Sequence, residues 1–308
     1  MRVGLDVGGT KTDAVAVRDD GSIAARVRIP TGWGAEEVVD TIRTATAQLC
    51  EQSDSELTDI VSIGVGIPGL VDLTTGHVLH AVNLGIESLD LAGWVQHHID
   101  VPCVVENDVK AAALGAAALR KDSRSMAFLN LGTGVAAGIV VDGELWRGMG
   151  GIAGEVGHIS VDPQGRLCGC GQHGCVETLC GGGAVAKAWG RPGALPIRDI
   201  FDAAEQGDLL AAQLREGLAA GAAAAIRIIV LSADVETVVL GGGITALGAR
   251  LLNDVKKALH RGAERSAFMK SLKLDERIEL LPSGSPAAAL GAALVGVPVK
   301  DQGAVVHG

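Results

Sequence analysis

The sequence carries one local pattern twice, and this repeat restricts the fold more than any other feature. A short apolar run ends in a glycine turn and a second apolar run follows, first over residues 3–17 and again over residues 126–141. The turns are Gly8-Gly9-Thr10 and Gly132-Thr133-Gly134. Glycine turns between apolar runs are typical of β-hairpins. Two such hairpins about 120 residues apart predict two domains of similar construction.

The rest of the chain alternates between strand and helix patterns, which is typical of α/β proteins. We expect further strands over residues 60–67, 101–105, 237–240 and 278–281, and helices over residues 35–51, 109–120, 208–231, 246–260 and 286–295.

From this order we predict an α/β chain of two domains. The N-terminal α/β domain covers residues 1–118, and a C-terminal helix over about residues 286–300 can pack back on it. The larger C-terminal α/β domain covers residues 119–285 and contains a cysteine-rich loop. A chain of 308 residues is long enough for two such cores.

The charge balance excludes a nucleic-acid partner. The chain has 26 Lys and Arg residues against 36 Asp and Glu residues, so its formal charge is −10. Binding to a phosphate backbone needs clustered cations, and base stacking needs aromatic platforms. The sequence has no basic block, and its aromatic residues are only 3 Phe and 4 Trp.

Neither a secretory signal nor a membrane segment is predicted. The first residues contain charges and no apolar core of the required length. The most apolar stretch, residues 218–233, is shorter than a membrane span and contains Arg227. We therefore expect a cytoplasmic protein with no membrane partner.

Three glycine turns that close strands are candidate phosphate-binding sites. Backbone N–H groups in such turns can surround an anion, and threonine hydroxyls add donors. Asp6, at the end of the first strand, can hold Mg²⁺ directly or through water. Alternatively, these are ordinary turns, Asp6 is a turn acceptor, and Lys11 is a solvated surface residue. The candidate nucleotide-binding residues are Asp6, Gly8, Gly9, Thr10, Lys11, Gly132, Thr133, Gly134, Gly241, Gly242 and Gly243.

Glu106-Asn107-Asp108 follows one expected strand and begins a helix. Asn and Asp are favoured helix N-caps, so a structural role is one interpretation. The other is catalytic, because a carboxylate at a strand end can accept the proton of a hydroxyl that attacks a phosphoryl group. Sequence spacing alone favours the cap.

A dense group of cysteines indicates a metal site rather than disulfides. Cys168, Cys170 and Cys175 lie close together in the sequence, and His158 precedes them. Three thiolates and one imidazole make a closed tetrahedral Zn²⁺ set, which favours a structural role. His173 and Cys180 are competing ligands. Zinc would fix the loop that carries Glu155 and Glu177, two carboxylates able to accept hydrogen bonds from polyol hydroxyls.

Together these motifs resemble the ROK family (repressors, open reading frames and kinases), and most of all its bacterial glucokinases. The resemblance covers essentially the whole chain, and its most specific part is the histidine and cysteine block. The motifs that carry it are, in chain order, Asp6-Val7-Gly8-Gly9-Thr10-Lys11-Thr12, residues 64–72, Glu106-Asn107-Asp108, residues 131–135, and the block from Glu155 to Glu177.

The resemblance implies a two-domain actin-like ATPase fold, ribonuclease-H-like in each domain, with a ligand cleft between the domains. ATP would lie on the glycine turns with Mg²⁺, and a hexose would lie in the cleft. Asp108 matches the catalytic base. The sugar-binding positions are Gly66, Gly69, Asn83, Asn107, Asp108, Glu155, His158 and Glu177, and the structural Zn²⁺ ligands are His158, Cys168, Cys170 and Cys175.

We therefore expect an ATP-dependent hexose kinase that phosphorylates the 6-hydroxyl of glucose, as a homodimer or higher homo-oligomer. Two alternatives stay open: a kinase for N-acetylmannosamine, N-acetylglucosamine or fructose, and a non-catalytic sugar sensor. A DNA-binding repressor is not expected, because such members carry a winged helix-turn-helix before the first strand. Cys180 departs from the serine that is common at this position in the kinases, and we expect this to affect packing only.

Overall fold

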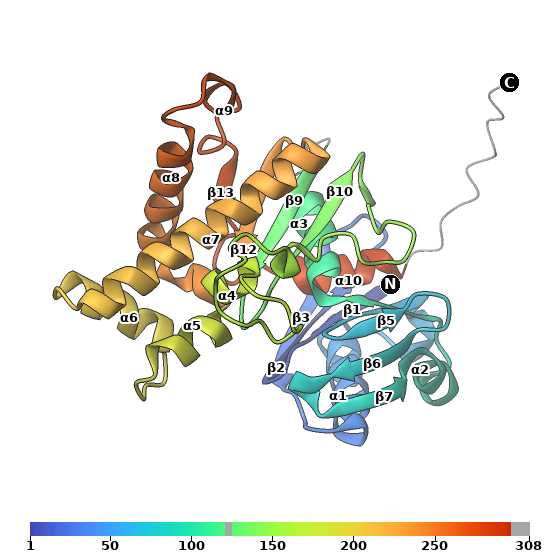
Figure 1. Ribbon diagram of the computed structural model, residues 1–308. Coiled ribbons are helices and arrows are strands. Elements are labelled where there is room, and N and C mark those ends of the chain that lie inside the picture. Colours follow the sequence, from blue (N-terminus) through green and yellow to red (C-terminus); the bar gives the residue numbers. More distant parts are fainter. Residues whose placement is uncertain (121–124, 297–308) are drawn as a thin grey trace, which may run out of the picture. The chain divides into compact units, whose positions relative to one another are not determined.

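The structure is a computed structural model that describes residues 1–120 and 125–296 (Figure 1). It divides into two compact units. Unit 1 holds Met1–Gly115 together with the described residues from Pro286 onward, and unit 2 holds Ala116–Ser285. The first chain connection between them runs through α3 (Asp108–Arg120). Residues 297–300 of the expected C-terminal helix lie outside the described residues.

The main sheet of unit 1 has the strand order β3-β2-β1-β4-β8. The first three strands pair antiparallel, whereas β1, β4 and β8 run parallel. The predicted hairpin is therefore confirmed as β1 and β2. The strands are β1 (Arg2–Val7), β2 (Lys11–Val17), β3 (Ile23–Pro30), β4 (Ser62–Ile67) and β8 (Cys103–Asn107).

The main sheet of unit 2 repeats this arrangement. Its order is β11-β10-β9-β12-β13, with β9 and β10 antiparallel and β9, β12 and β13 parallel. The same order and directions in both sheets confirm the repeat that the two glycine hairpins predict. The strands are β9 (Ser125–Leu131), β10 (Val135–Val141), β11 (Glu144–Leu145), β12 (Thr237–Gly241) and β13 (Ile278–Leu280).

Unit 1 also contains a small antiparallel sheet of β5 (Leu70–Asp72), β6 (His77–Ala81) and β7 (Ile86–Asp90), which the sequence analysis did not predict. A 3-10 helix, η2 (Val82–Leu84), connects β6 to β7. Val78, Ala81 and Ile86 are the buried side chains of these three strands, and the others are half-buried or exposed. Strands this short and this polar give little periodic signal.

Helices cover both faces of the main sheet in unit 1. Apolar side chains of β1 on one face join the core with α1 (Ala35–Ser53) and α2 (Leu91–Ile99). On the other face α10 (Ala287–Val295) packs against β1, β2 and β4. Its approach is at backbone distance, because a Cβ on Gly64 would lie 1.8 Å from the Ala292 carbonyl oxygen. The small residues of α10 and the strand glycines therefore make this close packing possible.

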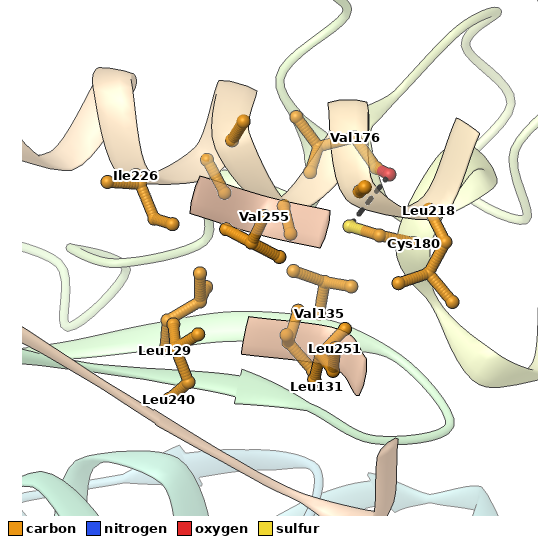
Figure 2. Close-up of a cluster of buried hydrophobic side chains, with 14 of the residues drawn as sticks. Leu129, Leu131, Val135, Val176, Cys180, Leu218, Ile226, Leu240, Leu251 and Val255 are labelled. Atoms are coloured by element: carbon orange, nitrogen blue, oxygen red, sulfur yellow. Dashed lines mark hydrogen bonds between the residues drawn. The ribbon is translucent and has the colours of Figure 1, made fainter. Parts of the chain in front are cut away.

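In unit 2 a layer of helices packs on the sheet. Figure 2 shows side chains of β9, β10 and β12 meeting those of α4, α7 and α8, with Leu129, Leu131 and Cys180 fully buried. The Cys180 thiol donates a hydrogen bond to the Val176 carbonyl at 3.4 Å. The helices are η3 (Val156–His158), α4 (Val176–Cys180), α5 (Gly182–Trp189), α6 (Pro196–Glu205), α7 (Leu209–Ala233), η4 (Gly243–Leu247), α8 (Ala249–Ala263) and α9 (Ala267–Ser271).

Helix α7 extends well beyond the apolar stretch of residues 218–233. Its 25 residues, Leu209–Ala233, are enough by length and hydropathy to cross a membrane, so the expectation of a stretch too short for this was wrong. Half of the apolar window is buried inside the protein, and Leu218 and Ile226 belong to the core of unit 2. The core of unit 2 therefore accounts for much of the apolar surface of α7.

Candidate active site

Asp6 lies at the carboxyl end of β1, in a crowded group of carboxylates. It pairs in register with Asp13 on β2 and with Gly66 on β4. Burial, and then the negative charges of Asp108 and Asp13, raise the pKa of Asp6 to about 7, while Lys11 and Arg28 oppose the shift. Oxygen donors gathered in this way suit Mg²⁺, whose positive charge would favour the ionised carboxylate. The structure thus fits the predicted role of Asp6.

The structure separates the roles of the two polar residues at the start of α3. The Asn107 side-chain oxygen accepts hydrogen bonds from the N–H groups of Val109 at 3.0 Å and Lys110 at 3.3 Å. Asn107 therefore makes the capping bonds. Asp108 is the first residue of the helix, and its Oδ1 accepts the Val109 N–H at 2.9 Å. The sequence had favoured a capping role for this pair, and that role falls mainly on Asn107.

Gly66 lies directly beside the start of α3. A Cβ at Gly66 would be 3.6 Å from the Cα of Asp108 and 3.1 Å from the Cβ of Ala111. Asp6, Gly66 and Asp108 thus meet at the carboxyl ends of three parallel strands, which is where α/β sheets bind ligands.

The glycine turn of unit 1 is held between two other loops. The Gly8 N–H donates to the Lys11 carbonyl at 3.1 Å, which closes the turn. Gly9 lies against Asn83 of η2, where a Cβ would be 2.8 Å from the Asn83 carbonyl oxygen. Gly69 has a φ of +105° and lies beside Ala81, two residues before Asn83. Asn83, which is expected near the sugar, therefore lies against the Gly8-Gly9-Thr10 turn that is expected to hold phosphate, and Gly69 lies beside β6, which leads to η2 and Asn83.

The second glycine turn is closed in the same way, by a hydrogen bond of 3.1 Å from the Gly132 N–H to the Gly134 carbonyl. Gly242 lies against Leu131, the residue directly before this turn, since a Cβ on Gly242 would be 2.5 Å from the Leu131 carbonyl oxygen. The N–H groups of Gly182 and Gly183 donate to the Gly132 and Thr133 carbonyls at 2.8 and 2.9 Å. Gly181-Gly182-Gly183 were not among the predicted site residues, although three consecutive glycines are a visible signal in the sequence.

The loop that carries Glu155 and His158 is fastened to β10. A Cβ at Gly154 or Gly157 would lie 1.9 Å from a carbonyl oxygen of that strand, and the Ala137 N–H donates to the Gly154 carbonyl at 2.7 Å. Glu155 is exposed at the start of η3, and His158 ends it. The two glycines therefore decide where these side chains are presented.

Glu177 is anchored to the same strand from α4. Its Oε2 accepts the Val135 N–H at 3.0 Å, and its Oε1 lies 4.0 Å from the Cys168 sulfur. One carboxylate oxygen is thus engaged by the hairpin that follows the glycine turn. Glu155, His158 and Glu177 consequently share one anchoring strand.

The four predicted zinc ligands converge. His158, Cys168, Cys170 and Cys175 each offer a donor atom, and these atoms all lie within 4.8 Å of one another. The sulfurs of Cys170 and Cys175 are 3.6 Å apart, and the Cys168 sulfur is 3.8 Å from the His158 Nδ1. Donors bound at about 2.0–2.3 Å to a tetrahedral Zn²⁺ lie about 3.5–3.8 Å apart. The donor set and its spacing fit zinc.

Both competing ligands are directed elsewhere. The His173 Nδ1 bonds to the Gly165 carbonyl at 3.0 Å, and Cys180 is buried in the core. Burial, and then the charge of Glu177, raise the pKa of the Cys180 thiol, so it is held as a neutral group.

The chain is similar to known proteins in both sequence and fold. A family model described as the ROK family matches residues 2–296. A glucokinase of Halalkalibacterium halodurans is 31% identical over 292 residues, covering 86% of this chain and 88% of that one. An N-acetylmannosamine kinase of Yersinia pseudotuberculosis is 34% identical over 246 residues, covering 78% and 82%. A crystal structure of a ROK family glucokinase from Streptomyces griseus in complex with glucose and AMPPNP matches with a TM-score of 0.77 and 31% identity, over 96% of this chain and 98% of that one.

Proposed function

The chain belongs to the ROK family, and we propose that it is an ATP-dependent sugar kinase that transfers the γ-phosphoryl group to the 6-hydroxyl of glucose. Its two similar α/β domains have the actin-like ATPase fold that the resemblance implied. The observation that carries the proposal is the meeting of Asp6, Gly66 and Asp108 at the carboxyl ends of β1, β4 and β8.

Asp108 is the proposed catalytic base. As the 6-hydroxyl oxygen attacks the γ-phosphorus, its proton passes to the Asp108 carboxylate, the bond to the β-phosphate oxygen breaks, and ADP leaves. Asp108 begins α3, where the helix dipole favours an ionised carboxylate. The capping bonds of Asn107 hold that helix start in place.

The glycine turns are the proposed phosphate-binding groups. Gly8 and Gly132 use their N–H groups to close the turns, so the donors for phosphate oxygens are those of Gly9, Thr10, Thr133 and Gly134. Mg²⁺ held at Asp6 would neutralise phosphate charge.

The sugar hydroxyls are proposed to bind Asn107 and Asp108 in unit 1, and Glu155, His158 and Glu177 in unit 2. The loops of Gly66, Gly69 and Asn83 would border the sugar. Zinc on His158, Cys168, Cys170 and Cys175 would be structural, because four protein ligands complete its coordination. It would fix the loop between Glu155 and Glu177.

A second acceptor, N-acetylmannosamine, is favoured by the Yersinia relative, which is as similar to this chain as the glucokinase. A cytoplasmic location and a homodimer or higher homo-oligomer stay predictions.

A coupled assay of ADP formation tests the function. Purified protein with Mg²⁺ and ATP is offered glucose, N-acetylmannosamine, N-acetylglucosamine and fructose, and kcat/KM is compared, because specificity is a ratio of these constants. The proposal expects glucose to give the highest value, and identification of the product as glucose 6-phosphate. A higher value for N-acetylmannosamine would replace the acceptor, and no turnover with any sugar would favour a sugar sensor.

A further inference from the structure

Charged side chains lie in one row across three strands of unit 1. Asp13 on β2 pairs in register with Asp6 on β1 and with Arg28 on β3. Residues directly opposite one another in a sheet project from the same face. Arg28 therefore lies on the face that carries Asp6, although nothing in the sequence motifs pointed to it.

Asp13 holds two guanidinium groups. Its Oδ2 accepts from the Arg28 Nε at 3.2 Å and Nη2 at 2.5 Å, while the Arg26 Nε reaches Oδ1 at 2.9 Å and the Arg26 Nη2 reaches Oδ2 at 2.6 Å. The Asp13 side chain is 11% exposed and that of Arg28 is 48% exposed. Among the described residues, Arg28 bonds through Nε and Nη2 alone. Its Nη1 donors are thus left for a ligand.

The carboxyl end of strand β3 lies beside the Gly8-Gly9-Thr10 turn. Pro30 pairs with Lys11, and the Thr31 N–H donates to the Thr10 carbonyl at 3.2 Å. Lys11 and Asp13 are two residues apart in one strand and so share a face. Two cations, Lys11 and Arg28, consequently stand on the Asp6 face next to the turn Gly8-Gly9-Thr10.

A triphosphate needs such cations here. Asp6, Asp13 and Asp108 gather negative charge at this end of the sheet, and a polyanionic donor would be repelled by them. A guanidinium already held by a buried carboxylate loses little rotamer freedom when it binds phosphate, and its planar fork suits phosphate oxygens.

We propose that Arg28 binds phosphate oxygens of the nucleoside triphosphate at the Gly8-Gly9-Thr10 turn, and that Asp13 is the positioning residue that holds it there. This rests on the proposed kinase function. The competing explanation is purely structural: the ion pairs fasten edge strand β3 to β2 and touch no ligand.

The test compares Arg28→Gln with Arg26→Gln. Each variant removes one of the two guanidinium partners of Asp13. Arg26 pairs in register with Val15, however, and so lies two residues further than Arg28 from the end of β3 that adjoins the Gly8-Gly9-Thr10 turn. Titration calorimetry measures the Kd of AMPPNP with Mg²⁺, and steady-state kinetics measure the KM of ATP and of glucose. Circular dichroism gives the Tm of each variant.

We expect Arg28→Gln to raise both the AMPPNP Kd and the ATP KM about tenfold or more, with the glucose KM changed less than about twofold. Arg26→Gln should change all three less than about twofold. Arg28→Lys should recover part of the loss, and Asp13→Asn should raise the ATP KM at unchanged glucose KM. Equal effects of the two Gln variants on AMPPNP binding, or none from Arg28→Gln, would overturn the proposal. If the wild-type protein phosphorylates no sugar, the kinase function fails, while the AMPPNP Kd values still decide whether Arg28 binds the nucleotide.

Discussion

The substitution Asp108→Asn separates catalysis from helix capping, the two roles that the sequence could not distinguish. The change is isosteric, and the new side chain keeps an oxygen that can accept the Val109 N–H, bonded at 2.9 Å in the native protein. The capping bonds of Asn107, at 3.0 and 3.3 Å, are untouched. Only the negative charge and the basicity at position 108 are lost.

The catalytic role and the capping role predict effects of different size on turnover and on stability. Loss of a general base lowers turnover about 10²–10⁴-fold, equivalent to about 2.7–5.5 kcal/mol in the barrier. Loss of a charge at a helix N-terminus costs only about 0.3–1 kcal/mol. Part of this is offset, because Asp108 is one of the charges that raise the pKa of Asp6. We therefore expect the Tm to fall by about 4 °C at most.

The assay measures kcat with ATP and the preferred sugar beside a thermal melt. Asp208→Asn is the matched control, since Asp208 caps α7 through the Ala211 N–H at 2.9 Å and pairs with Arg191, and neither residue belongs to the proposed site. It should lower the Tm and leave kcat unchanged. If Asp108→Asn behaves like this control, with near-normal kcat and a lowered Tm, Asp108 is a structural residue and the proposed chemistry is wrong.

Three further predictions test the metal, the packing of α10 and the acid stability. Metal analysis should find one Zn per chain, and Cys175→Ser should lower both zinc content and Tm; a zinc-free protein with normal Tm and turnover would refute the site. Gly64→Ala should destabilise unit 1 by about 1–3 kcal/mol in urea unfolding, because its Cβ would overlap the Ala292 carbonyl, whereas Gly217→Ala, with open space around it, should not destabilise; equal effects would contradict the packing argument. Burial alone would raise the pKa of Asp13, but its ion pairs with Arg26 and Arg28 outweigh it and hold that pKa below the usual value. The stabilisation by these ion pairs is therefore present above about pH 4 and is lost as the pH falls through the folded-state pKa of Asp13. The difference in unfolding free energy between wild type and Asp13→Asn should shrink in acid, and a difference independent of pH would refute this prediction.

Some expectations from sequence failed, each for its own physical reason. The helix expected over residues 246–260 is divided, because η4 ends at Leu247 and Gly248 takes a φ of +60° before α8. The small sheet of β5, β6 and β7 was missed, because its strands are held by partners across the sheet rather than by a long apolar pattern. The contact of Gly182 and Gly183 with the second glycine turn was missed because these two segments lie about 50 residues apart in the chain, so local spacing does not reveal it.

The two glycine hairpins, the alternation of strands and helices, and the four candidate zinc ligands could all be predicted from the amino-acid sequence. These follow from residue type and from spacing over a few positions, which fix local backbone conformation and ligand chemistry. The capping bonds of Asn107 beside Asp108, and the position of Arg28 in line with Asp6, became clear from the three-dimensional structure and not before. Which strands pair, and in which register, is set by packing between segments far apart in the chain, and local spacing does not contain that information.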